Sequence, residues 1–243
     1  MNEYVGDKIP FLNDLGLAIK NPSRALRYVF VKMPVFAQRY VPLDEIFIKQ
    51  EYNWLYKRIK PNTTLIDIGA YIGDSSIYFS FNPNVSKIFA YELVYKNYKE
   101  AEANFKRLGL LGSKVTLTNA GVDGYDGSID TDEKHGFDSG ARIEKMPKGS
   151  HKTQICSLKS ILKDKSNIII KADAEGAEHR MFEDADLSEV YAIQMEYHDG
   201  LKNLVAILEK KGFKVSTEEK VERAGEGYLY AERINNKSTK SRQ

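Results

Sequence analysis

From Thr63 onward, short runs rich in β-branched and aromatic residues alternate with longer stretches whose apolar residues recur at helical spacing. A strand, a helix and a second strand in succession fold as a parallel pair with the helix packed on the sheet, so this alternation predicts repeated βαβ units in an α/β domain. The predicted strands are 64–68, 87–92, 114–119, 168–173, 192–196, 214–216 and 227–232, and the predicted helices are 74–81, 95–108, 177–182 and 201–211.

The segments outside this pattern differ from it in composition. Prolines divide residues 1–60, which predicts an N-terminal extension of short helices and turns, and its last piece, 43–60, has helical spacing. The α/β domain is predicted to span 61–234. Its Gly- and Asp-rich stretch 121–153 is too long for a plain connection and is interpreted as an insertion, either a lid or a surface hairpin. The polar tail 235–243 is predicted to be disordered.

The composition excludes several kinds of protein. The chain is 42% hydrophobic and carries a net charge of only +2, with Lys and Arg spread along it, so nucleic acid is not an expected partner. The single cysteine, Cys156, excludes an internal disulfide and a structural zinc site, and a cytoplasmic location is expected. No signal peptide or transmembrane helix is predicted, although run 28–41 mixes basic and apolar residues and leaves peripheral membrane contact open.

The strand predicted at 64–68 leads directly into a glycine-bearing turn and the start of a helix. Gly69 and Gly73 would let the backbone approach a ligand where a Cβ would clash, and Asp74 with Ser75 would supply helix-capping groups. The sequence therefore predicts a cofactor site at the carboxyl end of this strand.

Glu92 ends the next strand, where an open α/β sheet places an acidic residue against the two hydroxyls of a ribose. This pairing suits the adenosine of NAD and of S-adenosylmethionine (SAM) equally. Two features favour SAM. The glycines follow Gly-x-x-x-Gly instead of the dinucleotide pattern Gly-x-Gly-x-x-Gly, and Asp67 precedes the first glycine, where the cationic amino-acid end of SAM needs a carboxylate. SAM is the predicted cofactor, and an NAD-dependent reductase is the distant alternative.

Three sequence blocks follow one another along the chain: Asp67-Ile-Gly-Ala-Tyr-Ile-Gly-Asp, Lys171-Ala-Asp-Ala-Glu-Gly-Ala-Glu and Met195-Glu-Tyr-His. In that order and at about those separations they resemble the FkbM-type methyltransferase family, over residues 50–232. The resemblance implies a Rossmann-like class I methyltransferase fold, with a sheet of seven strands, the last antiparallel, and helices on both faces. It also implies SAM-dependent methylation of a hydroxyl on a sugar, a polyketide or another small metabolite.

Matching positions in the resemblance extend the expected cofactor site. The turn 69–73 and Glu92 would hold SAM, and Asn119 with Ala120 would lie near the adenine. The family usually has asparagine where this chain has Tyr71, which leaves the side-chain contact at this position open. The predicted cofactor-binding residues are Asp67, Gly69, Ala70, Tyr71, Gly73, Asp74, Ser75, Glu92, Asn119 and Ala120.

Methyl transfer to an aliphatic hydroxyl needs alignment of sulfur, methyl and acceptor, and a base that takes the hydroxyl proton. Asp173 ends the predicted central strand, Glu175 follows it, and His198 ends the next strand, with a usual pKa that suits a base near neutral pH. These three are the predicted catalytic residues. Acids in the first turn of a helix also stabilise its positive end, which is the competing interpretation for Glu175 and Glu178.

Asp173, Glu175, Glu196 and His198 carry the donor types that bind a divalent cation, but no spacing in the sequence determines their geometry, so a metal is possible and not favoured. The other histidines, 135, 151 and 179, have no comparable support.

Two further functions stay open. The first is an RNA or protein methyltransferase, although the central strand ends in Asp-Ala-Glu-Gly and not in the Asn/Asp-Pro-Pro-aromatic segment that grips a base amine. The second is a non-catalytic SAM-binding or scaffolding module. The sequence leaves the identity of the hydroxylated acceptor and the oligomeric state undetermined.

Overall fold

The computed structural model describes Ile46 and residues 51–132, 134–135, 140–220 and 225–234. The chain divides into two compact units, 1–53 and 54–243. Most of the expected N-terminal extension, the run 28–41 and the tail 235–243 lie outside the described residues. Within the described part, none of the helices combines the length and apolar character needed to span a membrane.

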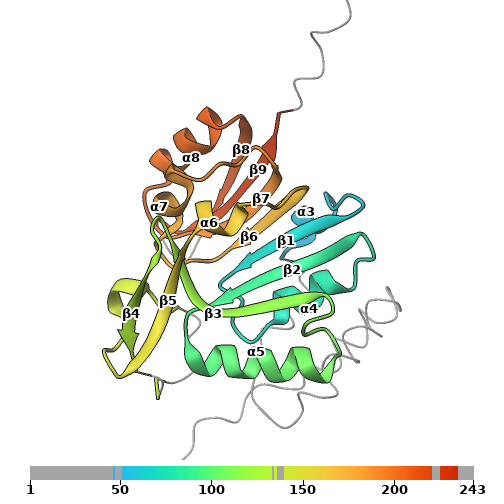
Figure 1. The fold of residues 1–243 in the computed structure, drawn as a ribbon. Coiled ribbons are helices and arrows are strands. Elements are labelled where there is room, and N and C mark those ends of the chain that lie inside the picture. The colour runs from blue at the N-terminus through green and yellow to red at the C-terminus, as the bar shows by residue number, and fades with distance from the viewer. Residues whose placement is uncertain (1–45, 47–50, 133, 136–139, 221–224, 235–243) are drawn as a thin grey trace, which may run out of the picture. The chain divides into compact units, whose positions relative to one another are not determined.

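Nine strands of the described residues form one sheet in the order β4-β5-β3-β2-β1-β6-β7-β9-β8 (Figure 1). Five neighbouring strands are parallel to one another: β3, β2, β1, β6 and β7. The last strand along the chain, β9, runs antiparallel to both of its neighbours, β7 and β8. This confirms the expected mostly parallel sheet with its last strand antiparallel. The seven expected strands are β1 (Thr63–Ile68), β2 (Val85–Glu92), β3 (Val115–Asp123), β6 (Ile168–Ala172), β7 (Val190–Tyr197), β8 (Phe213–Glu219) and β9 (Gly227–Arg233).

Two strands that the sequence did not predict extend the sheet beyond β3, so the number of strands is nine and not seven. β4 (Gly127–Thr131) pairs antiparallel with β5 (His151–Ser157), and β5 pairs parallel with the last four residues of β3. β4 lies within the stretch 121–153, and β5 begins in its last residues and continues to Ser157. β4 is an exposed edge strand made of Gly, Ser, Ile, Asp and Thr, a composition with weak β propensity, so nothing in the local pattern indicated it.

Helices cover both faces of the sheet (Figure 1). α6 (Leu158–Leu162), α7 (Glu178–Glu183) and α8 (Leu201–Lys210) pack into one hydrophobic cluster with strand residues, whereas α4 (Asp74–Ser80) and α5 (Tyr95–Arg107) lie on the opposite face. The helix expected over 43–60 is wrong at its carboxyl end, because α3 (Asn53–Tyr56) stops before Arg58. There the Arg58 guanidinium donates to the carbonyl of Trp54 at 3.0 Å, which takes up one carbonyl of the helix end.

The central strands are buried on both faces, as parallel strands between two helix layers must be. All five residues of β6 are buried, and its neighbour β1 has only one residue that is partly exposed. Polar side chains are therefore displaced to the carboxyl ends of the strands and to the turns that follow. The candidate site lies there.

Candidate functional site

The segment between β1 and α4 is a tight turn with an unusual backbone conformation. Gly69, Tyr71 and Gly73 all have positive φ, at 70°, 48° and 90°. The amides of Gly69 and Ala70 both donate to the carbonyl of Tyr91 on β2, at 3.0 Å each. The turn is thereby attached to the carboxyl ends of two strands, and four of the expected cofactor-binding residues lie together in it.

The two glycines of the turn are required by the protein's own packing. A Cβ on Gly69 would lie 2.1 Å from the carbonyl oxygen of Asp173, and a Cβ on Gly73 would lie 2.6 Å from the ring of Phe105. The structure thus gives these glycines a packing reason, while close approach of a ligand stays a prediction. The absent side chain of Gly69 lets β1 and β6 end side by side, and that of Gly73 leaves room for the ring of Phe105 on α5 (Tyr95–Arg107).

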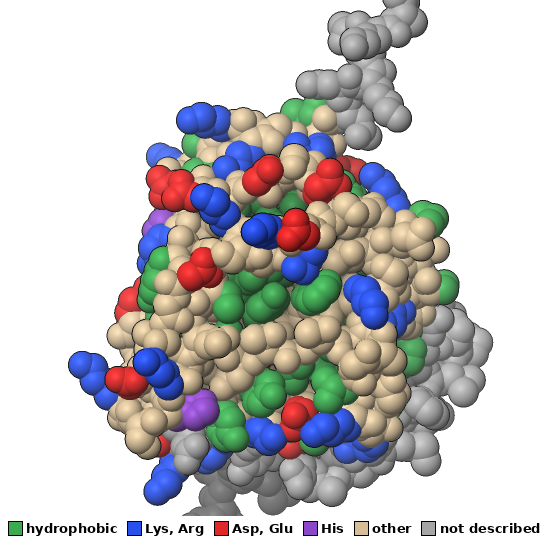
Figure 2. Space-filling model, viewed as in Figure 1, with side chains coloured by type: hydrophobic (Ala, Val, Ile, Leu, Met, Phe, Trp, Pro, Cys, Tyr) green, Lys and Arg blue, Asp and Glu red, His purple; other side chains and the backbone are tan. Residues whose placement is uncertain are grey.

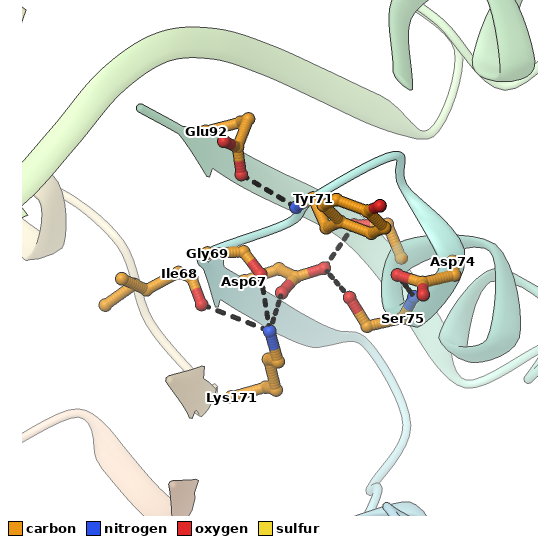
Figure 3. A network of polar contacts seen from close by, with 9 residues as sticks. Asp67, Ile68, Gly69, Tyr71, Asp74, Ser75, Glu92 and Lys171 are labelled. Atoms are coloured by element: carbon orange, nitrogen blue, oxygen red, sulfur yellow. Dashed lines mark hydrogen bonds and ion pairs between the residues drawn. The ribbon is translucent and has the colours of Figure 1, made fainter. Parts of the chain in front are cut away.

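Asp67 lies beneath this turn, fully buried (Figure 3). Its Oδ2 accepts hydrogen bonds from the hydroxyls of Ser75 and Ser76, at 2.6 Å each, and its Oδ1 lies 3.4 Å from Nζ of Lys171. These contacts connect the carboxyl end of β1 to the first turn of α4. Because the carboxylate has no exposed surface, Asp67 can act on a ligand only through the turn that it supports.

The start of α4 differs from the expected capping arrangement. Gly73 is the N-cap residue and supplies no side-chain cap, while Asp74 and Ser75 are the first residues inside the helix. Asp74 is buried, accepts a hydrogen bond from the Ser75 amide at 2.9 Å, and has its pKa raised to about 6 by burial. A carboxylate in the first turn meets the positive end of the helix dipole, which opposes part of that shift.

Lys171 is a site residue that the sequence analysis did not single out. Its ammonium is 3% exposed and donates to the carbonyls of Ile68 at 3.2 Å and Gly69 at 2.6 Å, beside the carboxylate of Asp67 (Figure 3). A cation that directly follows three isoleucines on a predicted strand was the available signal, because a lysine is almost never fully buried unless it is paired. Lys171 holds the carbonyls with which β1 enters the turn.

Glu92 lies at the end of β2, facing the turn (Figure 3). Oε2 accepts the amide of Tyr71 at 2.8 Å, and Oε1 accepts the amide of Val94 at 2.9 Å and the side-chain amide of Asn97 at 3.0 Å. Burial raises the pKa of Glu92 to about 7 against the opposing effect of these donors. Since a carboxylate offers about four acceptor sites, Glu92 retains capacity for a further donor such as a ribose hydroxyl.

Asn119 on β3 lies next to Glu92. Its side-chain amide donates to the carbonyls of Glu92 at 2.8 Å and of the following residue at 3.1 Å, and Oδ1 lies 3.2 Å from Nε2 of His151. The His151 ring packs 4.6 Å from that of Tyr95, and Ala120 follows, fully buried. The sequence analysis did not place His151 here, because β5, which carries it, was not predicted.

A second group of ionisable side chains follows β6 and β7. His198 is buried, and its Nδ1 lies 3.0 Å from Oε1 of Glu178, which also accepts the Gly176 amide at 3.0 Å. Nε2 of His198 lies 3.2 Å from Oε2 of Glu175. Asp173 joins this group with a buried Oδ1 that has no hydrogen-bond partner among the described residues. The structure thus brings together the three predicted catalytic residues and adds Glu178.

The charges in this group are strongly coupled. Burial by itself lowers the pKa of His198, but the hydrogen bond and charge of Glu178, with the charges of Glu175 and Asp173, raise it to about 9. Burial raises the pKa of Asp173 to about 6 and, with the charge of Asp173, that of Glu175 to about 7. The pKa of His198 is therefore well above the usual value on which its predicted role as a base depends. With this pKa both ring nitrogens carry a proton at pH 7, so the ring has no free nitrogen to accept the hydroxyl proton.

The two groups meet where β1 and β6 end. The amide of Asp173 donates to the carbonyl of Ile68 at 3.0 Å, and the Asp173 carbonyl is the atom that excludes a side chain from Gly69. Asp173 thus contacts the turn through its backbone, and its carboxylate lies with that of Glu175 and the ring of His198, one donor atom of each residue being within 4.8 Å of the others.

The stretch 121–153 reaches the second group. Arg180 on α7 donates to both carboxylate oxygens of Asp123, at 2.8 and 2.9 Å, and to Glu144. A Cβ on Gly176 would lie 3.6 Å from the guanidinium of Arg142. Part of this stretch therefore lies against the turn that carries Glu175.

The family model of the methyltransferase FkbM domain matches residues 67–215. The chain belongs to the FkbM methyltransferase family. The match begins at Asp67 and contains Glu92, Asp173 and His198, so both groups of this FkbM methyltransferase lie within the family's own domain. Tyr71 stands where the resemblance implies an asparagine, and its backbone amide donates the hydrogen bond to Glu92. No curated protein sequence matches the chain significantly.

Solved structures share the fold of this FkbM methyltransferase. Methyltransferase FkbM from Methylobacillus flagellatus KT has a TM-score of 0.51 and 12% identity, over 89% of this chain and 60% of that chain. TrmK from M. capricolum, in complex with S-adenosylhomocysteine (SAH), has a TM-score of 0.50 and 15% identity, over 76% of this chain and 68% of that chain. At these identities the likeness establishes the fold alone, which is the class I methyltransferase fold.

Proposed function

We propose that this FkbM methyltransferase binds SAM across the turn 69–73 and Glu92 and transfers its methyl group to a hydroxyl of a small metabolite or sugar. The observation that carries the proposal is the position of Asp173. It is hydrogen-bonded through its backbone to the end of β1, and its carboxylate belongs to the acidic group that follows β6 and β7. The methyltransferase domain in this proposal is 61–234.

The cofactor half of the proposal rests on the turn and its neighbours. Glu92 would accept the ribose hydroxyls, and the adenine would lie toward Asn119 and Ala120, beside the packed rings of Tyr95 and His151. SAM supplies the methyl group as a sulfonium. The protein's part is to hold the cofactor in a rigid turn, which Asp67 and Lys171 support from below.

The acceptor half rests on Asp173. Its buried Oδ1 has no partner among the described residues, so it can accept a hydrogen bond from an acceptor hydroxyl. As the oxygen–carbon bond forms and the carbon–sulfur bond breaks, the hydroxyl proton passes to this carboxylate, and the products are a methyl ether and SAH. A positioned base of this kind contributes about 10²- to 10⁴-fold to the rate. The charged ring of His198 has a different part, which is to offset the negative charge of its carboxylate neighbours.

The surface charge supports a small acceptor. Basic and acidic side chains are interspersed on the face drawn in Figure 2, and apolar side chains gather near its centre. A nucleic-acid-binding face instead concentrates lysine and arginine, because each neutralised phosphate contributes to affinity.

Calorimetric titration with SAH, beside NAD under the same conditions, tests the cofactor assignment. We expect SAH alone to bind, and Glu92→Ala to weaken it by about 10- to 100-fold through the loss of charge-assisted hydrogen bonds. Glu209→Ala, at an exposed position on α8, is the matched control and should bind as the wild type does. Binding of NAD, or of neither ligand, would overturn the assignment.

The acceptor class is tested with SAM that carries a labelled methyl group. Label should transfer to members of a panel of hydroxylated metabolites and sugars, and not to transfer RNA or to proteins. Transfer to RNA with none to the metabolites would instead establish an RNA methyltransferase. SAH binding with no transfer to any of these acceptors would favour a non-catalytic module.

A further inference from the structure

We propose that Asp173, Glu175 and His198 form a binding site for a divalent cation of the Mn²⁺ type. The site itself stands on the geometry of these three side chains, while any part of the cation in methyl transfer rests on the proposed function.

The donor atoms are close enough to share one ion. One donor atom of each of the three residues lies within 4.8 Å of the others. Nε2 of His198 and Oε2 of Glu175 are 3.2 Å apart. In octahedral coordination at about 2.1 Å, adjacent ligands lie about 3 Å from each other, so this pair already has the spacing of neighbouring ligands.

The orientation of His198 is that of a metal-binding histidine. Its Nδ1 is held at 3.0 Å by Oε1 of Glu178, and the Gly176 amide fixes the same oxygen from the other side, at 3.0 Å. A carboxylate on one ring nitrogen typically orients a histidine whose other nitrogen binds a metal. Nε2 is accordingly left facing Oε2 of Glu175 at 3.2 Å, with Oε1 of Glu196 farther away at 3.5 Å. Binding would displace the Nε2 proton, as it does for any histidine ligand.

Two buried oxygens provide a second, independent indication. Oδ1 of Asp173 and Oε2 of Glu178 have no partner among the described residues, and the Glu178 side chain is 1% exposed. A buried carboxylate oxygen without a donor is costly, because it has lost its hydration and gained nothing in return. A cation at Asp173 would satisfy its free oxygen directly and offset the negative charge beside Glu178.

A second possible triad, Glu196, His198 and Glu226, shares the histidine. Glu196 is already paired with the ammonium of Lys220, so a cation would have to displace that contact. The triad of Asp173, Glu175 and His198 requires no such exchange. We therefore assign the cation to the side of His198 that faces Asp173.

The donor set selects the class of cation. Carboxylates suit Mg²⁺, Ca²⁺ and Mn²⁺, whereas imidazole suits softer transition ions. One imidazole with two carboxylates fits Mn²⁺, which accepts both. The three side chains leave coordination positions for water or for an acceptor oxygen. An acceptor with two neighbouring oxygen atoms could occupy these positions. With Oδ1 of Asp173 bound to the ion, the second carboxylate oxygen of Asp173 would take the hydroxyl proton that the proposed function assigns to this side chain.

Titration of the chelator-treated full-length protein with MnCl₂ alone, followed by the electron paramagnetic resonance signal of free Mn²⁺, tests the site. We expect one tightly bound ion per chain, and at least tenfold weaker binding in Glu175→Gln and in His198→Leu. Glu183→Gln, an exposed acid on α7, and His179→Asn are the matched controls and should bind as the wild type does. Circular dichroism and thermal unfolding of each variant show whether it is folded.

The proposal is overturned if the wild type binds no Mn²⁺ up to millimolar concentration, with or without SAH. It is equally overturned if folded Glu175→Gln binds the ion as the wild type does. SAH calorimetry on the same samples separates the two proposals. SAH binding without Mn²⁺ binding removes only the cation site, and Mn²⁺ binding without SAH binding removes only the proposed function.

Discussion

Replacing Gly69 with alanine tests the reason that the structure gives for this glycine. The residue has φ of +70°, and an added Cβ would lie 2.1 Å from the carbonyl oxygen of Asp173. Gly109 is a matched position, because its φ is +65° and a Cβ there would meet nothing within 4 Å. The pair separates the cost of the backbone conformation from the cost of the clash.

The magnitudes follow from these two contributions. The left-handed conformation costs an alanine about 1 to 2 kcal/mol, which is the whole effect expected for Gly109→Ala. At Gly69 the Asp173 carbonyl must also move by about 1 Å to reach ordinary contact, and such overpacking costs about 1 to 3 kcal/mol more. Gly69→Ala should therefore lose about 2 to 5 kcal/mol of unfolding free energy.

Denaturant unfolding of both variants, with SAH calorimetry on each, is the measurement. Gly69→Ala should be the less stable protein and should also bind SAH at least tenfold more weakly, because the turn and Asp173 move apart. If the two variants lose equal stability, the reasoning from the clash is refuted. If Gly69→Ala keeps its stability and loses only SAH affinity, the glycine serves ligand approach after all.

Three further predictions concern charged groups. Burial raises the pKa of Glu92 from 4.5 to about 7, so the folded protein favours the neutral acid. The unfolding free energy of the wild type should therefore fall relative to that of Glu92→Gln as the pH rises from about 4.5 to 7. A difference in unfolding free energy between the two proteins that stays constant across that range would contradict this. Lys171→Met leaves the buried Asp67 carboxylate unpaired and should cost about 3 to 5 kcal/mol of unfolding free energy, which the double variant with Asp67→Asn should partly restore; no restoration would mean that the ion pair is not the cause. Asp173→Asn should lower kcat by about 10²- to 10⁴-fold with little change in the KM for SAM, and retained turnover would remove Asp173 from proton transfer.

Much of the fold could be predicted because its strands are locally marked. Strand β6, with its three consecutive isoleucines, is buried on both faces, and such a strand has a composition that a surface segment lacks. β4 and β5 escaped prediction for the opposite reason. β4 is the edge strand of the sheet and is mostly exposed, and β5 lies next to it. Their pairing joins residues about twenty positions or more apart along the chain. No local pattern encodes that contact.

The candidate site, too, could be predicted only in part. The sequence determined which side chains stand at strand ends, and parallel strands carry their carboxyl ends to one edge, so Asp173, Glu196 and His198 could be placed near one another in advance. Only the tertiary structure decided what each one does. It buried Asp67 beneath the turn with Lys171, a residue over a hundred positions away, and it surrounded His198 with carboxylates that raise its pKa to about 9. Burial and charge depend on every neighbour in space, whereas the sequence lists only neighbours along the chain.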